Sequence, residues 1–299
     1  MIKTPVTFAF NYTHCDEILR QYIMHAFAES GAKHLVLTND LMEMILKDAN
    51  LAAKVRAEAA SEGLTFMDSH AQYGGFYDLR TVDDATRRHA IHLHQLQIAI
   101  AAEMGIHTIT IHPGADTLNP EIPLEKQTEN VIRALDIVLP VAESFGVTVC
   151  IENSWSRLSR PNNLVYIKSK FPTDALGFCY DAGHANVLSS NAKQYEECAA
   201  RERWSMFGLE PEWEDHALEK MLPHIVNCHL HDNDGLDDSH LIPLRGTIDW
   251  KKLMGTLGKA PRLKYIQNES IEVFRPGEGR RTSMRETMEN MEKILQMLP

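Results

Sequence analysis

Residues 225–234 read IVNCHLHDND, and the interpretation of the whole chain starts from this stretch. An apolar pair, Ile225 and Val226, leads directly into two histidines and two aspartates, as expected where a buried strand reaches a reactive edge of a fold. Imidazoles and carboxylates are ligands that divalent metal ions accept. By itself the stretch fits either a metal site or a solvated acidic loop with incidental histidines, so the rest of the chain has to decide.

Strand-like apolar segments recur along the chain, and helical periodicity follows most of them. We expect strands at residues 6–11, 35–37, 64–67, 107–111, 147–151, 176–180, 225–230 and 263–267. Continuously apolar strands that alternate with helices are typical of a parallel sheet, and eight such units in 299 residues match one barrel. An open doubly wound sheet fits less well, because no glycine-rich dinucleotide motif follows the first strand. The sequence therefore predicts an α/β fold: a (β/α)8 TIM barrel forming a single domain over residues 1–299, with an elaborated loop region at about 187–224.

The composition limits the classes of partner and the cellular compartment. Lys and Arg number 30 against 41 Asp and Glu, a formal net charge of −11 that disfavours a polyanion such as duplex DNA as partner. No apolar run is long enough to span a membrane, and residues 1–5 do not resemble a signal peptide. The five cysteines contain no Cys-x-x-Cys pair and read as small buried side chains in a reducing compartment. We expect a cytoplasmic protein with no membrane partner.

Polar residues follow the carboxyl ends of the predicted strands, all of which face one rim of a parallel barrel. These residues are His70, His112, Glu152, Asp181, His184, His229 and Glu269, with Asp238 and His240 in the loop after the seventh strand. Any one of them can be ordinary scaffolding. A shared site explains better why the same end of successive strands carries them and the opposite end does not. Histidines inside predicted helices, such as His89, His92 and His94, read as surface or packing residues.

Four of these residues suffice to hold one divalent ion: Glu152, Asp181, His229 and Glu269. Three carboxylates and one imidazole favour Mn, Mg, Co or Zn over soft-metal chemistry. Glu152 and Glu269, on roughly opposite strands, can also flank a substrate and exchange protons with it as base and acid. The metal would polarise a carbonyl or hydroxyl and stabilise an enediolate.

In this order and spacing, the motifs resemble the xylose-isomerase-like barrel superfamily over essentially the whole chain. That superfamily holds sugar and sugar-phosphate isomerases and epimerases together with apurinic (AP) endonucleases of the endonuclease IV type. The matching pieces are Ser69-His70, His112-Pro113-Gly114, Ile151-Glu152-Asn153, Asp181-Ala182-Gly183-His184, His229-Leu230-His231-Asp232, Asp238-Ser239-His240, Gly246-Thr247-Ile248-Asp249-Trp250 and Glu269. The resemblance implies that His229 is a metal ligand with His231 behind it. It also implies that His184 contacts substrate and that Glu152 and Glu269 are both ligands and acid/base catalysts.

The resemblance leaves two chemistries open. In the nuclease branch, His70, His112, His184, Asp238 and His240 would join the core set to hold three zinc ions, and all nine positions are filled here. The net charge of −11 favours the other branch. We therefore expect a divalent-metal-dependent isomerase or epimerase acting on a small sugar, polyol or sugar derivative, with nucleic acid not favoured as a partner. A zinc-dependent AP endonuclease and a non-enzymatic binding module are the alternatives, and a homo-oligomer stays open.

Several positions bear on the substrate. Ketose 3-epimerases of this superfamily carry an acid and an arginine where this chain has Leu158 and Gly235, which argues against a simple ketose epimerase. Arginines after the last two strands can hold a phosphate or carboxylate, or can simply form a solvated basic loop; they are Arg245, Arg275, Arg280 and Arg281. Aromatic residues after the third and fifth strands can form an apolar wall for a sugar ring or pack the loops; they are Tyr73, Phe76, Tyr77 and Trp155.

Overall fold

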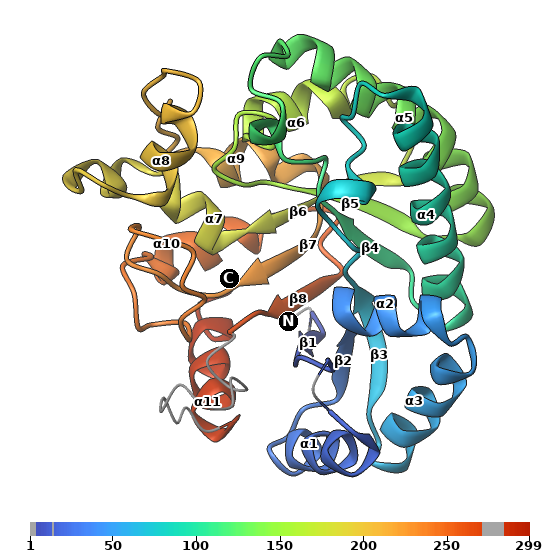
Figure 1. The fold of residues 1–299 in the computed structure, drawn as a ribbon. Coiled ribbons are helices and arrows are strands. Elements are labelled where there is room, and N and C mark those ends of the chain that lie inside the picture. The colour runs from blue at the N-terminus through green and yellow to red at the C-terminus, as the bar shows by residue number, and fades with distance from the viewer. Residues whose placement is uncertain (1–3, 14, 271–283) are drawn as a thin grey trace.

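Eight short parallel strands form the centre of the protein, and helices surround them (Figure 1). The computed structural model describes residues 4–13, 15–270 and 284–299. The strands are β1 Val6–Phe8, β2 His34–Leu37, β3 Thr65–Ser69, β4 Thr108–Ile111, β5 Thr148–Glu152, β6 Leu176–Asp181, β7 Ile225–Leu230 and β8 Tyr265–Asn268. The predicted (β/α)8 barrel is confirmed.

The sheet runs in the order β3-β2-β1-β8-β7-β6-β5-β4, and every pair of neighbours in that order is joined by a parallel ladder. The two outer strands, β3 and β4, meet at one bridge between His70 and Thr110, where the Ala71 amide donates to the Thr110 carbonyl at 2.9 Å. Asp181 lies opposite His229 in the register of β6 with β7. The register thus sets polar residues of neighbouring strands at the same level of the barrel.

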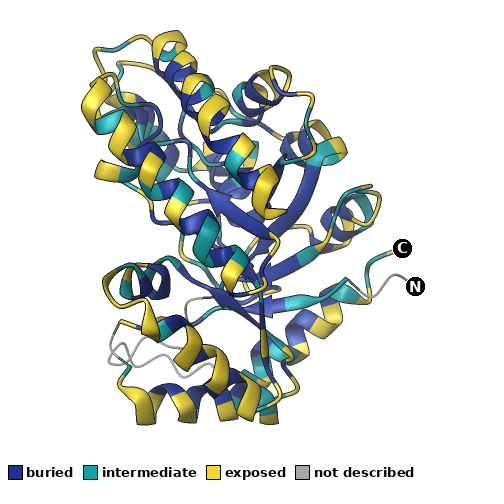
Figure 2. Cartoon of the chain, turned by 90° about the vertical axis from the view of Figure 1, so that its right-hand side faces the viewer, coloured by how far each residue is buried: buried dark blue, intermediate teal, exposed yellow. Residues whose placement is uncertain are grey.

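The helices pack their apolar faces on the strands and leave their polar faces to solvent (Figure 2). They are α1 Glu17–Glu29, α2 Asn39–Lys47, α3 Asn50–Ser61, α4 Asp84–Glu103, α5 Leu124–Phe145, α6 Pro161–Lys168, α7 Ala182–Val187, α8 Ala199–Ser205, α9 Ala217–Met221, α10 Trp250–Leu257 and α11 Met284–Leu295. Strands and helices share one large hydrophobic core. Across the described ranges, none of the helices has the length and apolarity that crossing a membrane requires.

Several expectations about element bounds differ from the structure, most of the strands by one or two residues at an end. The first strand was expected at 6–11 but ends at Phe8, and the last, expected at 263–267, is Tyr265–Asn268. One helix was expected between the second and third strands, whereas the chain forms α2 and α3. The break comes at Asp48, whose backbone is extended and whose carboxylate accepts from the Asn50 amide at 3.1 Å. An Asp that bonds the backbone two residues on favours a turn over a continuing helix.

Between β6 and β7, the chain forms α7, α8 and α9 with short 3-10 turns. A small apolar cluster of Val187, Leu188, Ala192, Cys198 and Ala200 packs here against Trp155 from the loop after β5. The indole of the fully buried Trp204 in α8 donates to the Trp155 carbonyl at 2.8 Å. These contacts hold α8 against the loop that follows β5.

Candidate functional site

The side chains of Glu152, Asp181, His229 and Glu269 meet at the carboxyl ends of β5 to β8. Nδ1 of His229 lies 2.6 Å from Oε1 of Glu152, 3.3 Å from Oε1 of Glu269 and 3.7 Å from Oδ2 of Asp181. Glu152 and Asp181 are the last residues of their strands, and Glu269 follows the end of β8. The structure thus brings together the four residues that the sequence proposed for one metal ion.

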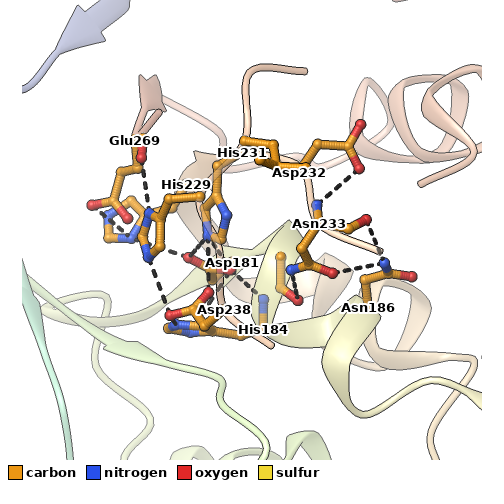
Figure 3. Close-up of polar contacts among 12 residues, drawn as sticks. Asp181, His184, Asn186, His229, His231, Asp232, Asn233, Asp238 and Glu269 are labelled. Carbon is orange, nitrogen blue, oxygen red and sulfur yellow. Dashed lines mark hydrogen bonds and ion pairs between the residues drawn. The ribbon is translucent and has the colours of Figure 1, made fainter. Parts of the chain in front are cut away.

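A second group lies beside the first and is built on His184, His231, Asp238 and His240 (Figure 3). Oδ2 of Asp238 is within hydrogen-bond distance of two imidazoles: it lies 3.2 Å from Nε2 of His184 and 3.1 Å from Nε2 of His240. Nε2 of His231 lies 3.1 Å from each carboxylate oxygen of Asp181, so His231 links the two groups. The rings of His231 and His240 stack with centroids 3.8 Å apart.

His70 and His112 approach the first group from β3 and β4. Nε2 of His112 lies 2.5 Å from Oε2 of Glu152, and Nε2 of His70 lies 3.6 Å from the same oxygen. Glu152 therefore has imidazoles on both of its oxygens. All nine polar rim residues predicted from the sequence gather within this one region, and their individual roles stay predictions.

The imidazoles and carboxylates shift one another's ionisation. Burial alone would raise the pKa of Glu152, but His229 and His112 beside it bring the pKa well below its usual range. Burial opposes protonation of His229, yet Glu269 and Glu152 raise its pKa to about 10. His240 behaves likewise, since its hydrogen bond to Asp238 outweighs burial and raises its pKa to about 9. The site is a buried network of carboxylates and imidazoles whose charges depend on one another.

The donor set fits a divalent cation. The buried carboxylates of Glu152 and Asp181 and the half-buried carboxylate of Glu269 surround His229, and in the described part of the chain no lysine or arginine pairs with any of them. In the second group, the buried Oδ1 of Asp238 accepts no hydrogen bond from the described residues. Buried carboxylates need a compensating cation, which either the protonated imidazoles beside them or a divalent ion can supply. Oxygen with imidazole nitrogen is the ligand set of Mn, Zn, Co or Mg.

Two supporting residues were not singled out from the sequence. Asn153 exchanges hydrogen bonds with the Asp181 backbone at 2.8 and 2.9 Å, and its own carbonyl lies 2.8 Å from Nδ1 of His184. Gln267 donates to Oε1 of Glu269. Asn153 directly follows Glu152 and Gln267 precedes Glu269 by two residues, so position next to a ligand candidate was the available signal.

A cavity of about 1010 Å³ opens onto these groups, at the upper end of the range for small-molecule pockets. Glu152, His184, Asp238, His240 and Glu269 line it, together with side chains from α1 and the ends of β1 and β2. Its size leaves room for a substrate beside the carboxylates.

Of the aromatic wall proposed from the sequence, only half faces the cavity. Tyr73 and Trp155 line it. Phe76 instead lies edge-on to His89, and Tyr77 lies against His94. Of the two alternatives left open for Phe76 and Tyr77, the packing role applies, because the 3-10 turn Gly75–Tyr77 directs them to α4.

The residues considered for substrate specificity also have defined places. Leu158 is fully buried in the hydrophobic core. Arg245 pairs with Glu286 of α11 and is not among the cavity-lining residues. Arg275, Arg280 and Arg281 lie outside the described residues.

The curated proteins with related sequences are distant relatives. A protein of Sinorhizobium fredii described as uncharacterized protein y4fM is 24% identical over 205 residues, which cover 62% of this chain and 58% of that protein. An uncharacterized protein of Methanocaldococcus jannaschii is 24% identical over 61% of this chain and 57% of its own length. The chain thus spans less than two thirds of these relatives.

Solved structures match over nearly the whole chain. A D-tagatose 3-epimerase-like protein has a TM-score of 0.71 at 16% identity, covering 98% of this chain and 96% of its own. A 3-keto-D-glucoside 4-epimerase from E. coli has a TM-score of 0.70 at 15% identity, covering 98% and 100%. The IOLI protein with a bound zinc atom has a TM-score of 0.67 at 15% identity, covering 97% of each. At these identities, the likeness establishes the fold.

The sequence model of one family covers most of the chain. The xylose isomerase-like TIM barrel model matches residues 25–294, a range that begins in α1 and ends in α11. Because this match includes seven of the eight strands of a barrel that the structure forms in full, the chain belongs to the xylose isomerase-like TIM barrel family.

Proposed function

We propose that this protein is a divalent-metal-dependent sugar isomerase or epimerase. The observation that carries the proposal is the placement of two glutamates, Glu152 and Glu269, on one imidazole nitrogen of His229 at 2.6 and 3.3 Å, with both glutamates lining the cavity. Structural neighbours named as sugar epimerases support the same reaction class.

The metal site of the proposal consists of Glu152, Asp181, His229 and Glu269. A divalent ion held by these residues would act as a Lewis acid on the carbonyl and hydroxyl oxygens of a sugar and so would make the C–H group next to the carbonyl more acidic. A neighbour whose title names a bound zinc atom supports a metal in this fold.

The two glutamates supply the proton transfers. One carboxylate removes the proton from the carbon next to the carbonyl, and the electron pair of that C–H bond moves into an enediolate. The other glutamate, protonated, returns a proton to the enediolate, so substrate and product are isomers. His184 lines the cavity and would contact the substrate.

One observation keeps the alternative of a zinc-dependent AP endonuclease: His70, His112, His184, Asp238 and His240 gather beside the four core residues. Elemental analysis of protein purified without chelator, with anomalous diffraction to place each ion, separates the two functions. One ion on the core residues supports the isomerase or epimerase. Three zinc ions that also engage the five additional residues would favour the nuclease.

The proposed function predicts that Glu269→Gln abolishes proton exchange and leaves the fold intact. Metal-loaded protein is incubated with a panel of ketoses and aldoses in deuterated water, and deuterium incorporated at carbon is measured. Loss of an acid/base group lowers the rate about 100- to 10,000-fold. The fold should be unaffected, because glutamine has nearly the same shape as glutamate. Circular dichroism and thermal unfolding check the fold.

Asp237→Asn is the matched control, because Asp237 is an exposed carboxylate of the neighbouring loop that does not line the cavity. Its exchange rate should equal that of the wild type. Equal losses in Asp237→Asn and Glu269→Gln, or undiminished exchange in Glu269→Gln, would contradict the assignment of Glu269.

A further inference from the structure

We infer that Arg203 selects substrates that carry an anionic group, a carboxylate or a phosphate, so that the substrate is a sugar acid or sugar phosphate. The inference rests on the proposed function and names its substrate class. It assigns a specificity role to a residue of α8, a helix between β6 and β7.

Arg203 is joined to the candidate active site through one aromatic side chain. Its guanidinium carbon lies 5.3 Å from the centroid of the Trp155 ring, and that ring lies edge-on to His184 with centroids 5.0 Å apart. All three side chains line the cavity. The guanidinium is therefore within roughly 10 Å of an imidazole that borders the carboxylate cluster, which is within the reach of a single sugar derivative.

The neighbouring arginines all have carboxylate partners, and Arg203 does not. Arg157 pairs with Asp116 at 3.1 Å, Arg160 pairs with Glu212 and Arg201 pairs with Glu210. Within residues 4–13, 15–270 and 284–299, the Arg203 guanidinium forms neither an ion pair nor a hydrogen bond, and Arg203 is the single lysine or arginine lining the cavity. Its charge is thus available to a ligand.

The setting of Arg203 suits an anion. The cation–π contact with Trp155 uses none of the guanidinium N–H groups as a hydrogen-bond donor to a described residue, so they are free to donate to a ligand. Carboxylates and phosphates accept such donors in pairs. Arg203 is half-buried, which strengthens the interaction, and Trp155 is itself held by the Trp204 hydrogen bond.

The charge distribution of the cavity gives the ligand a direction. Glu152, Asp238 and Glu269 lie at the candidate active site together with His184 and His240, while the single arginine of the described lining is on the α8 side. An anionic substituent is attracted to Arg203. This orientation would leave the neutral carbonyl and hydroxyl groups of the substrate over Glu152 and Glu269.

Isothermal titration calorimetry on Mn²⁺-loaded protein tests the inference with D-fructose, D-fructose 6-phosphate and D-fructuronate, which differ at one terminal carbon. We expect at least one anion to bind about tenfold or more tighter than D-fructose, as a charge-assisted hydrogen bond provides. Which of the two anionic sugars binds more tightly shows whether the site prefers a phosphate or a carboxylate. Added salt should lower the affinity for the anionic sugar and leave the affinity for D-fructose unchanged.

Arg203→Gln should remove this preference, and Arg203→Lys should retain part of it. Arg201→Gln is the matched control, because Arg201 lies on the same helix and its guanidinium carbon is also 5.3 Å from a tryptophan ring, but it does not line the cavity. Equal affinities for all three sugars, no binding of either anion, or equal losses in the two glutamine variants would overturn the inference.

Failure of this inference and failure of the proposed function give different results. If only the inference fails, a neutral sugar exchanges deuterium at the same rate in Arg203→Gln and in the wild type. If only the proposed function fails, the Arg203-dependent anion preference persists while no sugar exchanges its carbon-bound proton.

Discussion

At the scale of single residues, the histidines of this chain show how their surroundings set their charge. His229 is buried, yet Glu269 and Glu152 raise its pKa to about 10. His94 in α4 is equally buried, but its surroundings offer only the Tyr77 carbonyl, 2.9 Å from Nε2, so burial lowers its pKa to about 4. His94 is therefore a neutral packing residue, although its side chain is ionisable.

His94 should make the protein less stable in acid. Its folded pKa of about 4 lies below the ordinary value of 6.5, so between these values the unfolded chain binds a proton that the folded protein does not. The free energy of unfolding falls as pH drops below 6.5, and the loss levels off below about 4. At pH 5 we expect His94 to account for about 2 kcal/mol of the loss relative to neutral pH.

Urea unfolding at pH 7.5 and pH 5 measures this contribution. His94→Gln retains a donor for the Tyr77 carbonyl and removes the titration, so its two unfolding free energies should differ less than those of the wild type. His92→Gln, at an exposed position of the same helix, should behave as the wild type. If the unfolding free energy of His94→Gln fell between pH 7.5 and pH 5 by as much as that of the wild type, His94 would not be the cause.

Site residues at or soon after strand ends could be predicted from the sequence, whereas a cavity residue placed by tertiary contacts alone could not. Glu152, Asp181 and His229 end or nearly end apolar runs, and parallel strands bring such positions to one rim. Arg203 lies on a short helix that only tertiary contacts through Trp155 and Trp204 place beside the cavity. Arg245 was considered for anion binding, but Glu286 pairs with it from a helix far along the chain.

At the scale of elements, the loop after β7 is organised by one buried carboxylate. Oδ2 of Asp232 accepts from the Trp250 indole at 2.7 Å and the Leu244 amide at 3.0 Å, and Oδ1 accepts from the amides of Asn233 and Ile248. The Asp232 backbone exchanges two 2.7 Å hydrogen bonds with Leu241. The loop so held carries Asp238 and His240 to the site.

The conformation of His240 depends on that support. Its φ angle is 49°, in the left-handed region that non-glycine residues rarely adopt. The ring is held at both nitrogens, with Nδ1 2.8 Å from the Glu269 carbonyl and Nε2 3.1 Å from Asp238. Tertiary contacts thus maintain a backbone geometry that the local sequence does not favour.

Asp232→Ala should release this loop while the barrel stays folded. Removing a buried acceptor of four hydrogen bonds leaves unpaired donors, and we expect a loss of about 3 kcal/mol in unfolding free energy. Hydrogen exchange at the amides of Leu241, Leu244 and Ile248 should accelerate more than exchange in β5 and β6. Mn²⁺ affinity should also fall if Asp238 and His240 help to hold ions.

Trp250→Phe provides the graded control, since it removes one of the four hydrogen bonds and keeps an aromatic ring in the core. Its unfolding free energy should fall by about 1 kcal/mol, and amide hydrogen exchange in the loop should change less than in Asp232→Ala. If Asp232→Ala left exchange at Leu241 and Leu244 unchanged, the loop would be held by its packing instead.

Elements differ in how far their sequence determines them. The strands β4 to β7 are buried along their whole length and contain closely spaced apolar and β-branched residues, so they were predicted to within two residues. The break between α2 and α3 was missed, because one Asp turn interrupts a sequence with helical propensity on both sides. Local propensity gave no sign of where that turn would form.

At the scale of the whole molecule, the barrel closes at a seam between β3 and β4 that lacks a continuous ladder. Apart from the bridge at Thr110, side-chain hydrogen bonds hold the seam. The buried carboxylate of Asp68 accepts from the Thr108 hydroxyl at 2.6 Å and from the Asn227 amide at 2.9 Å, so it joins β3 to β4 and β7. Asn227 donates in turn to the Thr110 hydroxyl at 2.9 Å.

This seam is next to the candidate active site. The Thr110 hydroxyl lies 3.5 Å from Nε2 of His229, whose other nitrogen faces Glu152. A polar network inside the barrel therefore connects closure of the sheet to the orientation of the proposed metal ligand. The sequence predicted the eight strands but not the position of the seam, which depends on pairing between residues far apart in the chain.

Asp68→Ala should weaken the seam selectively. It leaves buried donors of Thr108 and Asn227 unpaired, which should cost about 3 kcal/mol of unfolding free energy in urea denaturation. Thr65→Ala, at an exposed position of the same strand, should cost less than about 1 kcal/mol.

The decisive measurement is hydrogen exchange of the Ala71 amide, which bonds across the seam to Thr110. Exchange there should accelerate in Asp68→Ala while Val149, which bonds between β5 and β6, stays protected until global unfolding. Equal acceleration at both amides would mean that the barrel opens as one unit and that the Asp68 network has no special part in closing it.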